Sequence, residues 1–290
     1  MTEFADRFWT SADGLNLYAR DYPGADGPAK LPVICIHGLT RNSRDFEEVA
    51  PRIAAQGRRV LAVDVRGRGR SDYDQNPANY QPPVYGGDMI ALMAQAGIAR
   101  AVFVGTSMGG LITMAIAAMN PPAVAAAVLN DVGPELSPVG LGRILTYVGG
   151  RKGPVESWDD AADFAQSING LAFPDAGPEH WRAFARRIFR EENGRPVLDY
   201  DPKISQAFAA YDPSRPQPDL WPLFQAFTTG RRVLFVHGGI SDLVDDPIAE
   251  RMRAVDPELV YARVPNVGHA PMLTEPEARE ALDRFLAEVP

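Results

Sequence analysis

Short apolar runs recur along the chain, and each has the length of a buried strand. They are rich in Val, Ile, Leu and Ala, and they show no polar position on alternate residues. Strands that are apolar on both faces are typical of a parallel sheet covered by helices on both sides. The pattern therefore predicts five core strands, within residues 32–38, 58–67, 99–107, 123–133 and 231–239.

Segments with apolar residues at helical spacing alternate with these runs. Alternation of strand and helix predicts an α/β fold, and right-handed crossovers bring the carboxyl ends of its parallel strands to one edge of the sheet. Two short segments around Gly14 predict a hairpin at the amino end, and residues 259–264 predict a further strand. We expect helices within residues 43–55, 87–96, 108–119, 247–255 and 276–289.

The alternation breaks between residues 134 and 228. This segment shows amphipathic helical stretches separated by loops rich in Pro and Gly, and one stretch begins with a capping box of Ser157 and Asp160. We interpret residues 134–228 as a helical cap inserted before the penultimate strand. Residues 1–133 and 229–290 then form one core domain around a mostly parallel sheet flanked by helices.

Ser107 lies where a predicted strand meets a predicted helix, with Gly105 and Gly109 on either side. A serine hydroxyl attacks a carbonyl only if it is exposed and is served by a base and by donors for the oxyanion. A very tight strand-to-helix turn exposes the hydroxyl, and only small neighbours fit such a turn. We predict that Ser107 is a nucleophile; the alternative is an ordinary helix-capping serine.

His269 is the predicted base, because it follows the last predicted strand and precedes the final helix. His37 and His237 each end a strand before a glycine, and His180 begins an amphipathic helix, where we expect it at the surface. We interpret His37 as a structural residue that shapes its turn.

Asp242 is the predicted acid, because it lies in the loop after the strand within residues 231–239. Asp131, directly after the preceding strand, is the alternative. Asp245 and Asp246 are interpreted as the start of the next helix, where carboxylates suit the helix dipole.

Backbone N–H groups are the predicted oxyanion donors. One belongs to Met108, the residue after the nucleophile, and the other belongs to Leu39, which the turn at His37 and Gly38 exposes.

Five motifs follow one another along the chain: HGLT at 37–40, DVRGRGRSD at 64–72, GTSMGG at 105–110, GGISDLV at 238–244 and GHAPMLTEP at 268–276. In this order, they resemble the α/β-hydrolase family of the single-cap type, which is related to bacterial esterases, enol-lactonases and meta-cleavage-product hydrolases. The resemblance implies a triad of Ser107, Asp242 and His269, oxyanion donors at Leu39 and Met108, and no cofactor. A serine at the turn excludes the dehalogenases and epoxide hydrolases of this fold, which use aspartate there.

Composition narrows the partners. The chain carries 29 Lys and Arg against 37 Asp and Glu, a net charge of −8, which argues against nucleic acids and anionic membranes. Its single cysteine, Cys35, excludes an internal disulfide. The amino end lacks the features of a signal peptide, so we expect a cytoplasmic protein. No cluster has metal-ligand spacing, so we expect no metal. The expected partner is a small-molecule substrate, and the sequence also allows a homo-oligomer.

The expected reaction is hydrolysis of a carboxylic ester of small to medium size, largely apolar, through an acyl-enzyme. Lactone opening, C–C bond hydrolysis and cofactor-free peroxidation of halides would use the same residues. A ligand receptor built on the same scaffold is the non-enzymatic alternative. The sequence identifies no substrate-binding residue.

Overall fold

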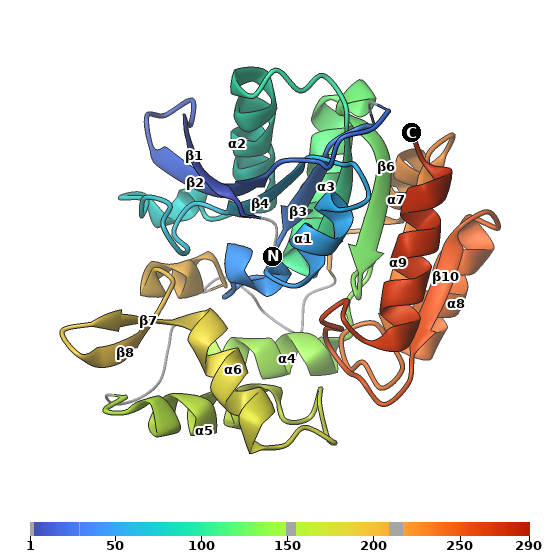
Figure 1. Ribbon diagram of the computed structural model, residues 1–290. Helices are drawn as coiled ribbons and strands as arrows, with labels where there is room; N and C mark the ends of the chain where they lie inside the picture. Colours follow the sequence, from blue (N-terminus) through green and yellow to red (C-terminus); the bar gives the residue numbers. More distant parts are fainter. Residues whose placement is uncertain (1–2, 29, 149–154, 209–216) are drawn as a thin grey trace.

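An eight-stranded sheet runs through the molecule in the computed structural model, which describes residues 3–28, 30–148, 155–208 and 217–290 (Figure 1). The strand order is β1-β2-β4-β3-β5-β6-β9-β10. The first two neighbouring pairs are antiparallel and the other five are parallel. The strands are β1 (Ala5–Thr10), β2 (Asn16–Tyr22), β3 (Val33–Ile36), β4 (Val60–Asp64), β5 (Ala101–Thr106), β6 (Val124–Asn130), β9 (Arg232–Gly238) and β10 (Val260–Val264).

The five apolar runs contain the five core strands, as their pattern predicts. Every residue of β3 and β4 is buried, because helices cover both faces of the sheet. Side chains of β3 alternate between two apolar clusters, with Ile34 and Ile36 on one face and Val33 and Cys35 on the other. The predicted hairpin around Gly14 is β1 paired with β2.

Helices pack on the two faces. α2, α3, α7 and α8 contribute to the cluster that contains Ile34, and α1 and α9 contribute to the cluster that contains Val33. The helices are α1 (Val49–Ala54), α2 (Pro82–Gln95), α3 (Met108–Met119), α7 (Trp221–Thr228), α8 (Asp246–Val255) and α9 (Pro276–Glu288), with short 3₁₀ turns η1 (Ser43–Phe46), η2 (Pro77–Asn79) and η3 (Pro121–Ala123).

The segment between β6 and β9 carries further elements, and in Figure 1 most of them lie together below the core. α5 and α6 pack through their own apolar cluster, which includes Trp181 and Phe184. The capping box of Ser157 and Asp160 is present at the start of α5. The elements are α4 (Pro138–Tyr147), α5 (Trp158–Asn169), α6 (Pro178–Ile188), β7 (Phe189–Glu192), β8 (Arg195–Leu198) and η4 (Pro202–Phe208).

Two parts of residues 134–228 differ from a helical cap. β7 and β8 form an antiparallel hairpin whose turn, Asn193-Gly194, has positive φ at both residues, the conformation that Asn-Gly hairpin turns require. α7 packs on α3, and its Phe224 and Phe227 join the main core cluster. We therefore count α7 with the core layer, and we use the name cap for α4, α5, α6 and the β7–β8 hairpin.

A buried carboxylate ties the cap to the core. Asp199, just after β8, accepts hydrogen bonds from Arg44 at 2.6 Å and from Asn42 at 3.3 Å. Asn42 and Arg44 also donate to the carbonyl of Arg187 at the end of α6. Arg187 in turn pairs with Glu47 at 2.8 Å. One side of the cap is therefore fixed to the residues at and around η1.

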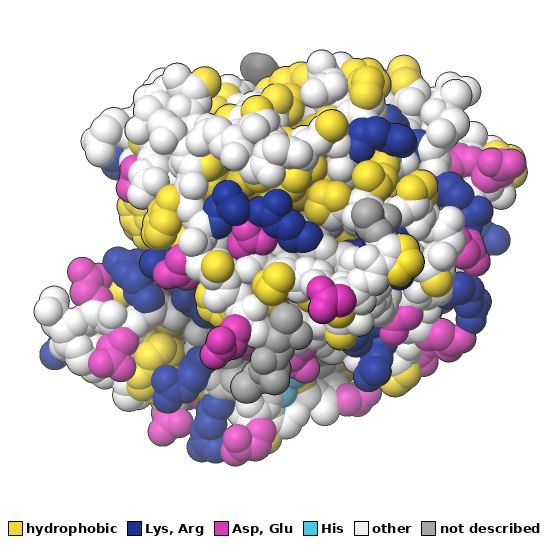
Figure 2. Space-filling view, turned by 45° about the horizontal axis from the view of Figure 1, so that its top comes forward, with side chains coloured by type: hydrophobic (Ala, Val, Ile, Leu, Met, Phe, Trp, Pro, Cys, Tyr) yellow, Lys and Arg dark blue, Asp and Glu magenta, His cyan; other side chains and the backbone are white. Residues whose placement is uncertain are grey.

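Charged side chains of both signs are intermixed on the face seen in Figure 2. In the described ranges, no helix combines the length and the apolar character needed to cross a membrane.

Close backbone approach at Gly109 makes the fold sensitive to one added carbon. A Cβ there would overlap the carbonyl of Ile36 in β3, which is backbone and cannot turn away. We expect Gly109→Ala to lower the free energy of unfolding by about 2 kcal/mol or more, measured by denaturant unfolding. In the control Gly87→Ala, on α2, the added Cβ meets no atom within 4 Å. This control should raise the free energy of unfolding by about 0.5–1 kcal/mol, because alanine favours a helix more than glycine does. Equal changes in the two variants would contradict the packing argument.

Candidate active site

Ser107 occupies a strained turn between β5 and α3. Its φ of 52° and ψ of −118° lie outside the regions that serine ordinarily adopts. The turn is possible only because strand and helix backbones touch, and a Cβ on Gly105 would overlap the backbone of Gly109 and Gly110. The predicted tight turn is therefore present, and at its tip Ser107 is half-buried and lines a pocket.

His269 lies in the loop after β10, and its Nε2 is 2.8 Å from Ser107 Oγ. The loop is held from the cap side, because the N–H of Gly268 donates to the carbonyl of Ala172 at 2.8 Å. The imidazole is mostly shielded, with 8% of its side chain exposed. The structure thus brings together the predicted nucleophile and the predicted base, which are 162 positions apart.

The acid that reaches His269 is Asp131, and the prediction of Asp242 is wrong on this point. Asp131 Oδ2 lies 2.8 Å from His269 Nδ1. The same oxygen accepts from Ser241 Oγ at 2.6 Å, and Oδ1 accepts from the N–H of Gly238 at 2.8 Å. These donors orient a fully buried carboxylate toward the imidazole.

The two aspartates follow different strands and have different partners. β6 lies between β5 and β9, so the end of β6 is one strand away from Ser107 and the end of β9 is two strands away. Asp131 is the first residue after β6, whereas Asp242 lies four residues beyond Gly238. The carboxylate of Asp242 instead binds Arg143 of α4, at 2.5 and 2.9 Å. The one sequence signal for Asp131 was its place directly at a strand end.

The backbone N–H groups predicted as oxyanion donors are those of Leu39 and Met108. Met108 is the first residue of α3, and Leu39 lines the same pocket as Ser107. Within the described residues, neither N–H donates to a protein acceptor. Both are therefore available to a substrate oxygen.

His37 shapes the turn before Leu39. It is fully buried; its Nδ1 donates to the carbonyl of Gly38 at 2.7 Å, and its Nε2 accepts from the N–H of Val65 at 3.1 Å. This arrangement requires the neutral imidazole, and desolvation lowers the pKa of His37 to about 3. The hydrogen bonds agree with the interpretation of His37 as structural.

The other two histidines also have local roles. His237 binds the hydroxyl of Tyr261 and the carbonyl of Val244. His180 is half-buried rather than at the surface, and its ring packs against Phe173 and Trp181.

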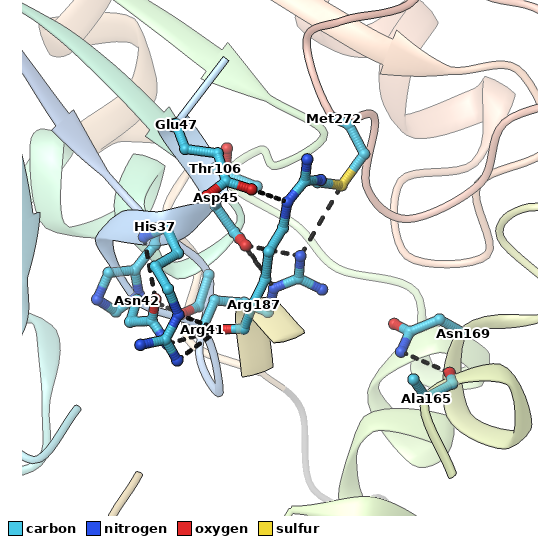
Figure 3. A network of polar contacts seen from close by, with 12 residues as sticks. His37, Arg41, Asn42, Asp45, Glu47, Thr106, Ala165, Asn169, Arg187 and Met272 are labelled. Atoms are coloured by element: carbon cyan, nitrogen blue, oxygen red, sulfur yellow. Dashed lines mark hydrogen bonds and ion pairs between the residues drawn. The ribbon is translucent and has the colours of Figure 1, made fainter. Parts of the chain in front are cut away.

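A pocket lies above Ser107, between the core and the cap. One wall is polar: dashed lines in Figure 3 join the Arg41 guanidinium to Asp45 and to the sulfur of Met272. The same guanidinium lies 3.9 Å from the ring centre of Phe184 on α6. The pocket is thus mixed in character, and its apolar lining comes from Ile144, Tyr147, Ile168, Phe173, Phe184, Ile188 and Met272.

No group of three or more His, Cys, Asp or Glu side chains is arranged for a metal in the part of the chain that the structure describes. The residues around Ser107 can supply a nucleophile, a base, an orienting carboxylate and two backbone donors.

Residues 32–276 match the alpha/beta hydrolase fold family, and the chain belongs to this family. The protein is a hydrolase, and the resemblance seen in its motifs is confirmed.

Relatives of known name cover nearly the whole chain. It is 35% identical over 253 residues to the 3-hydroxybutyrate-oligomer hydrolase of Cupriavidus necator, with 84% of each chain covered. It is 26% identical over 256 residues to the 2-(acetamidomethylene)succinate hydrolase of Mesorhizobium japonicum, covering 88% of this chain and 87% of that protein. The crystal structure of an alpha/beta hydrolase from Novosphingobium aromaticivorans is 47% identical, with 99% of each chain covered and a TM-score of 0.90.

The buried His37 predicts a pH dependence of stability. Its folded pKa of about 3 lies below the unfolded value of 6.5, so the unfolded chain binds the extra proton between these values. The neutral His37 therefore contributes fully to the free energy of unfolding above pH 6.5. This contribution is lost as the pH falls toward 3, by about 1 kcal/mol per pH unit. We expect His37→Gln, measured by denaturant unfolding from pH 7 to pH 4, to show a shallower loss than the wild type. Equal slopes would contradict this assignment.

Proposed function

We propose that the protein hydrolyses a carboxylic ester through a covalent acyl-enzyme on Ser107. The observation that carries the proposal is the continuous hydrogen-bonded chain from Ser107 Oγ through His269 to Asp131, with 2.8 Å at each step. A nucleophile, a base and an orienting carboxylate in this geometry define the serine triad, whatever their order in the chain.

In the first half-reaction, Ser107 Oγ attacks the carbonyl carbon of the ester as its proton passes to His269 Nε2. Negative charge develops on the carbonyl oxygen, and the N–H groups of Leu39 and Met108 stabilise it. Asp131 holds the imidazole by Nδ1 and stabilises the imidazolium. The protonated His269 then gives its proton to the leaving alcohol, and the acyl group stays on Ser107.

In the second half-reaction, His269 takes a proton from water, and the resulting hydroxide attacks the acyl carbon. The bond to Ser107 Oγ breaks, the oxygen recovers its proton from His269, and the carboxylic acid leaves. The balance is one ester and one water to one acid and one alcohol, so the cycle needs no cofactor.

We propose a short aliphatic ester as the substrate. Apolar side chains such as Ile144 and Ile188 suit an acyl chain, and Thr40, Arg41 and Asn169 supply polar contacts in the same pocket. Esters of a short hydroxy acid fit this mixed lining, and the name of the Cupriavidus relative, a 3-hydroxybutyrate-oligomer hydrolase, supports testing them first.

Ser107→Ala removes the nucleophile, so we expect hydrolysis of p-nitrophenyl butyrate to fall at least 10³-fold while the circular dichroism spectrum is kept. Labelling by a fluorophosphonate probe should vanish as well. The matched control is Ser167→Ala on α5, whose exposed hydroxyl donates only to the carbonyl of Phe164. It should hydrolyse and label like the wild type.

Retained turnover in Ser107→Ala would contradict the acyl-enzyme proposal. A wild type that binds ligands but is neither labelled nor active would favour a receptor. A panel of the 3-hydroxybutyrate dimer, a γ-lactone and a vinylogous 1,5-diketone separates ester, lactone and C–C bond hydrolysis, because all three would need Ser107.

Two aspartates compete for the role of acid, and their asparagine variants distinguish them. Asp131→Asn keeps the shape but gives up the charge that orients His269, so kcat should fall about 10³–10⁴-fold. Asp242→Asn removes a carboxylate that does not touch His269, and at the pH optimum its kcat should fall less than about tenfold. A reversed order of these losses in initial-rate measurements would restore Asp242 as the acid.

A further inference from the structure

A second carboxylate lies beside the triad without joining it. Asp242 forms a two-pronged ion pair with Arg143, at 2.5 and 2.9 Å. Arg143 belongs to α4 of the cap and Asp242 to the loop after β9, so the pair joins the two parts of the molecule. Both side chains are largely shielded, with 17% and 27% exposed.

The pair is close to His269. Arg143, Asp242, Gly268 and His269 line one small cleft on the flank of the active site. The neighbour of Asp242, Ser241, donates its hydroxyl to the carboxylate oxygen of Asp131 that holds His269. Asp242 and His269 interact electrostatically across this cleft, so a change of charge at Asp242 acts on the imidazole.

Several charged or titratable groups surround His269. Asp131 faces it from the end of β6, and Asp242 from the loop after β9. Arg143 and Tyr147 face this region from α4. The loop after β3 contributes Arg41, which is already paired with Asp45 at 2.7 Å.

Arg143 keeps the second carboxylate compensated. Burial alone would raise the pKa of Asp242, but the hydrogen bonds and charge of Arg143, with a smaller contribution from His269, bring it below its usual range. Asp242 is thus an anion at neutral pH, and Arg143 cancels it at close range.

The same pair fixes a wall of the substrate pocket. α4 is docked on the loop of Asp242, because the N–H of Ser137 donates to the carbonyl of Leu243 at 2.8 Å and a Cβ on Gly140 would overlap that loop. Ile144 and Tyr147, on the same helix, line the pocket of Ser107.

We propose that Arg143 and Asp242 are positioning residues of the active site: Arg143 neutralises a second carboxylate beside His269, so that Asp131 alone sets the charge balance at the imidazole. The inference rests on the proposed function, because it concerns a His269 that must be neutral to accept the proton of Ser107. Its physical content is that the two charges act on His269 with opposite sign.

The test is the pH dependence of the rate at which a fluorophosphonate labels Ser107, a reaction that needs nucleophile and base but no natural substrate. Arg143→Gln leaves Asp242 uncompensated and favours the imidazolium, so the midpoint of the acidic limb should rise by about half a pH unit or more. Asp242→Asn leaves the Arg143 cation and should lower the midpoint by a similar amount. The double variant should return it close to the wild-type value.

Arg143→Lys is the matched control, because it keeps the charge while losing the two-pronged geometry; its midpoint should stay near that of the wild type. Opposite shifts that cancel in the double variant support the proposal. Slower labelling at every pH with an unmoved midpoint would overturn it, since it would show that the pair only holds α4 in place. Shifts of the same sign would overturn it as well. A wild type that is not labelled at all would instead refute the serine mechanism, and this inference with it.

Discussion

The close contact of backbones around Ser107 is the constraint on which the site depends. β5, Ser107 and α3 form a turn so tight that a Cβ is excluded at Gly105 and at Gly109, two residues before and after the serine, and Gly109 packs directly on the carbonyl of Ile36 in β3. Ser107 is held at a positive φ, which is unfavourable in conformational free energy for a serine. The packing of the surrounding sheet and helix must offset this strain. Because α3 begins at Met108, directly after Ser107, the same turn sets the position of the proposed nucleophile and of one N–H group that the proposed mechanism uses as an oxyanion donor.

Features that depend on local periodicity were predictable from the sequence. The runs that became β3, β4, β5, β6 and β9 are apolar on both faces, and this pattern arises when helices cover a sheet on both sides. The helix after Ser107 runs over Met108–Met119, as its spacing indicates. The β7–β8 hairpin was missed, although Asn193-Gly194 is a hairpin signal, because its strands are only four residues long and have little apolar alternation.

The identity of the acid was not predictable in the same way, because it depends on tertiary distance. Asp131 and Asp242 both follow core strands, and no local pattern states which carboxylate the imidazole will meet. In the structure the two carboxylates differ in their partners: Gly238 and Ser241 orient Asp131 toward the imidazole, and a cap arginine engages Asp242.

The attachment of Asp199 to Asn42 and Arg44 ties one edge of the cap to the chain segment that follows Leu39. Separating the two would take the Asp199 carboxylate away from Arg44 and Asn42 and leave it with Arg190, 3.6 Å away on the cap side of the contact. Asn42 and Arg44 follow Leu39 by three and five positions, so this edge of the cap is linked through a few residues to the loop that lines the pocket of Ser107. An opening of the cap at this edge would disturb the chain next to Leu39, whereas an opening at another edge would leave these contacts intact.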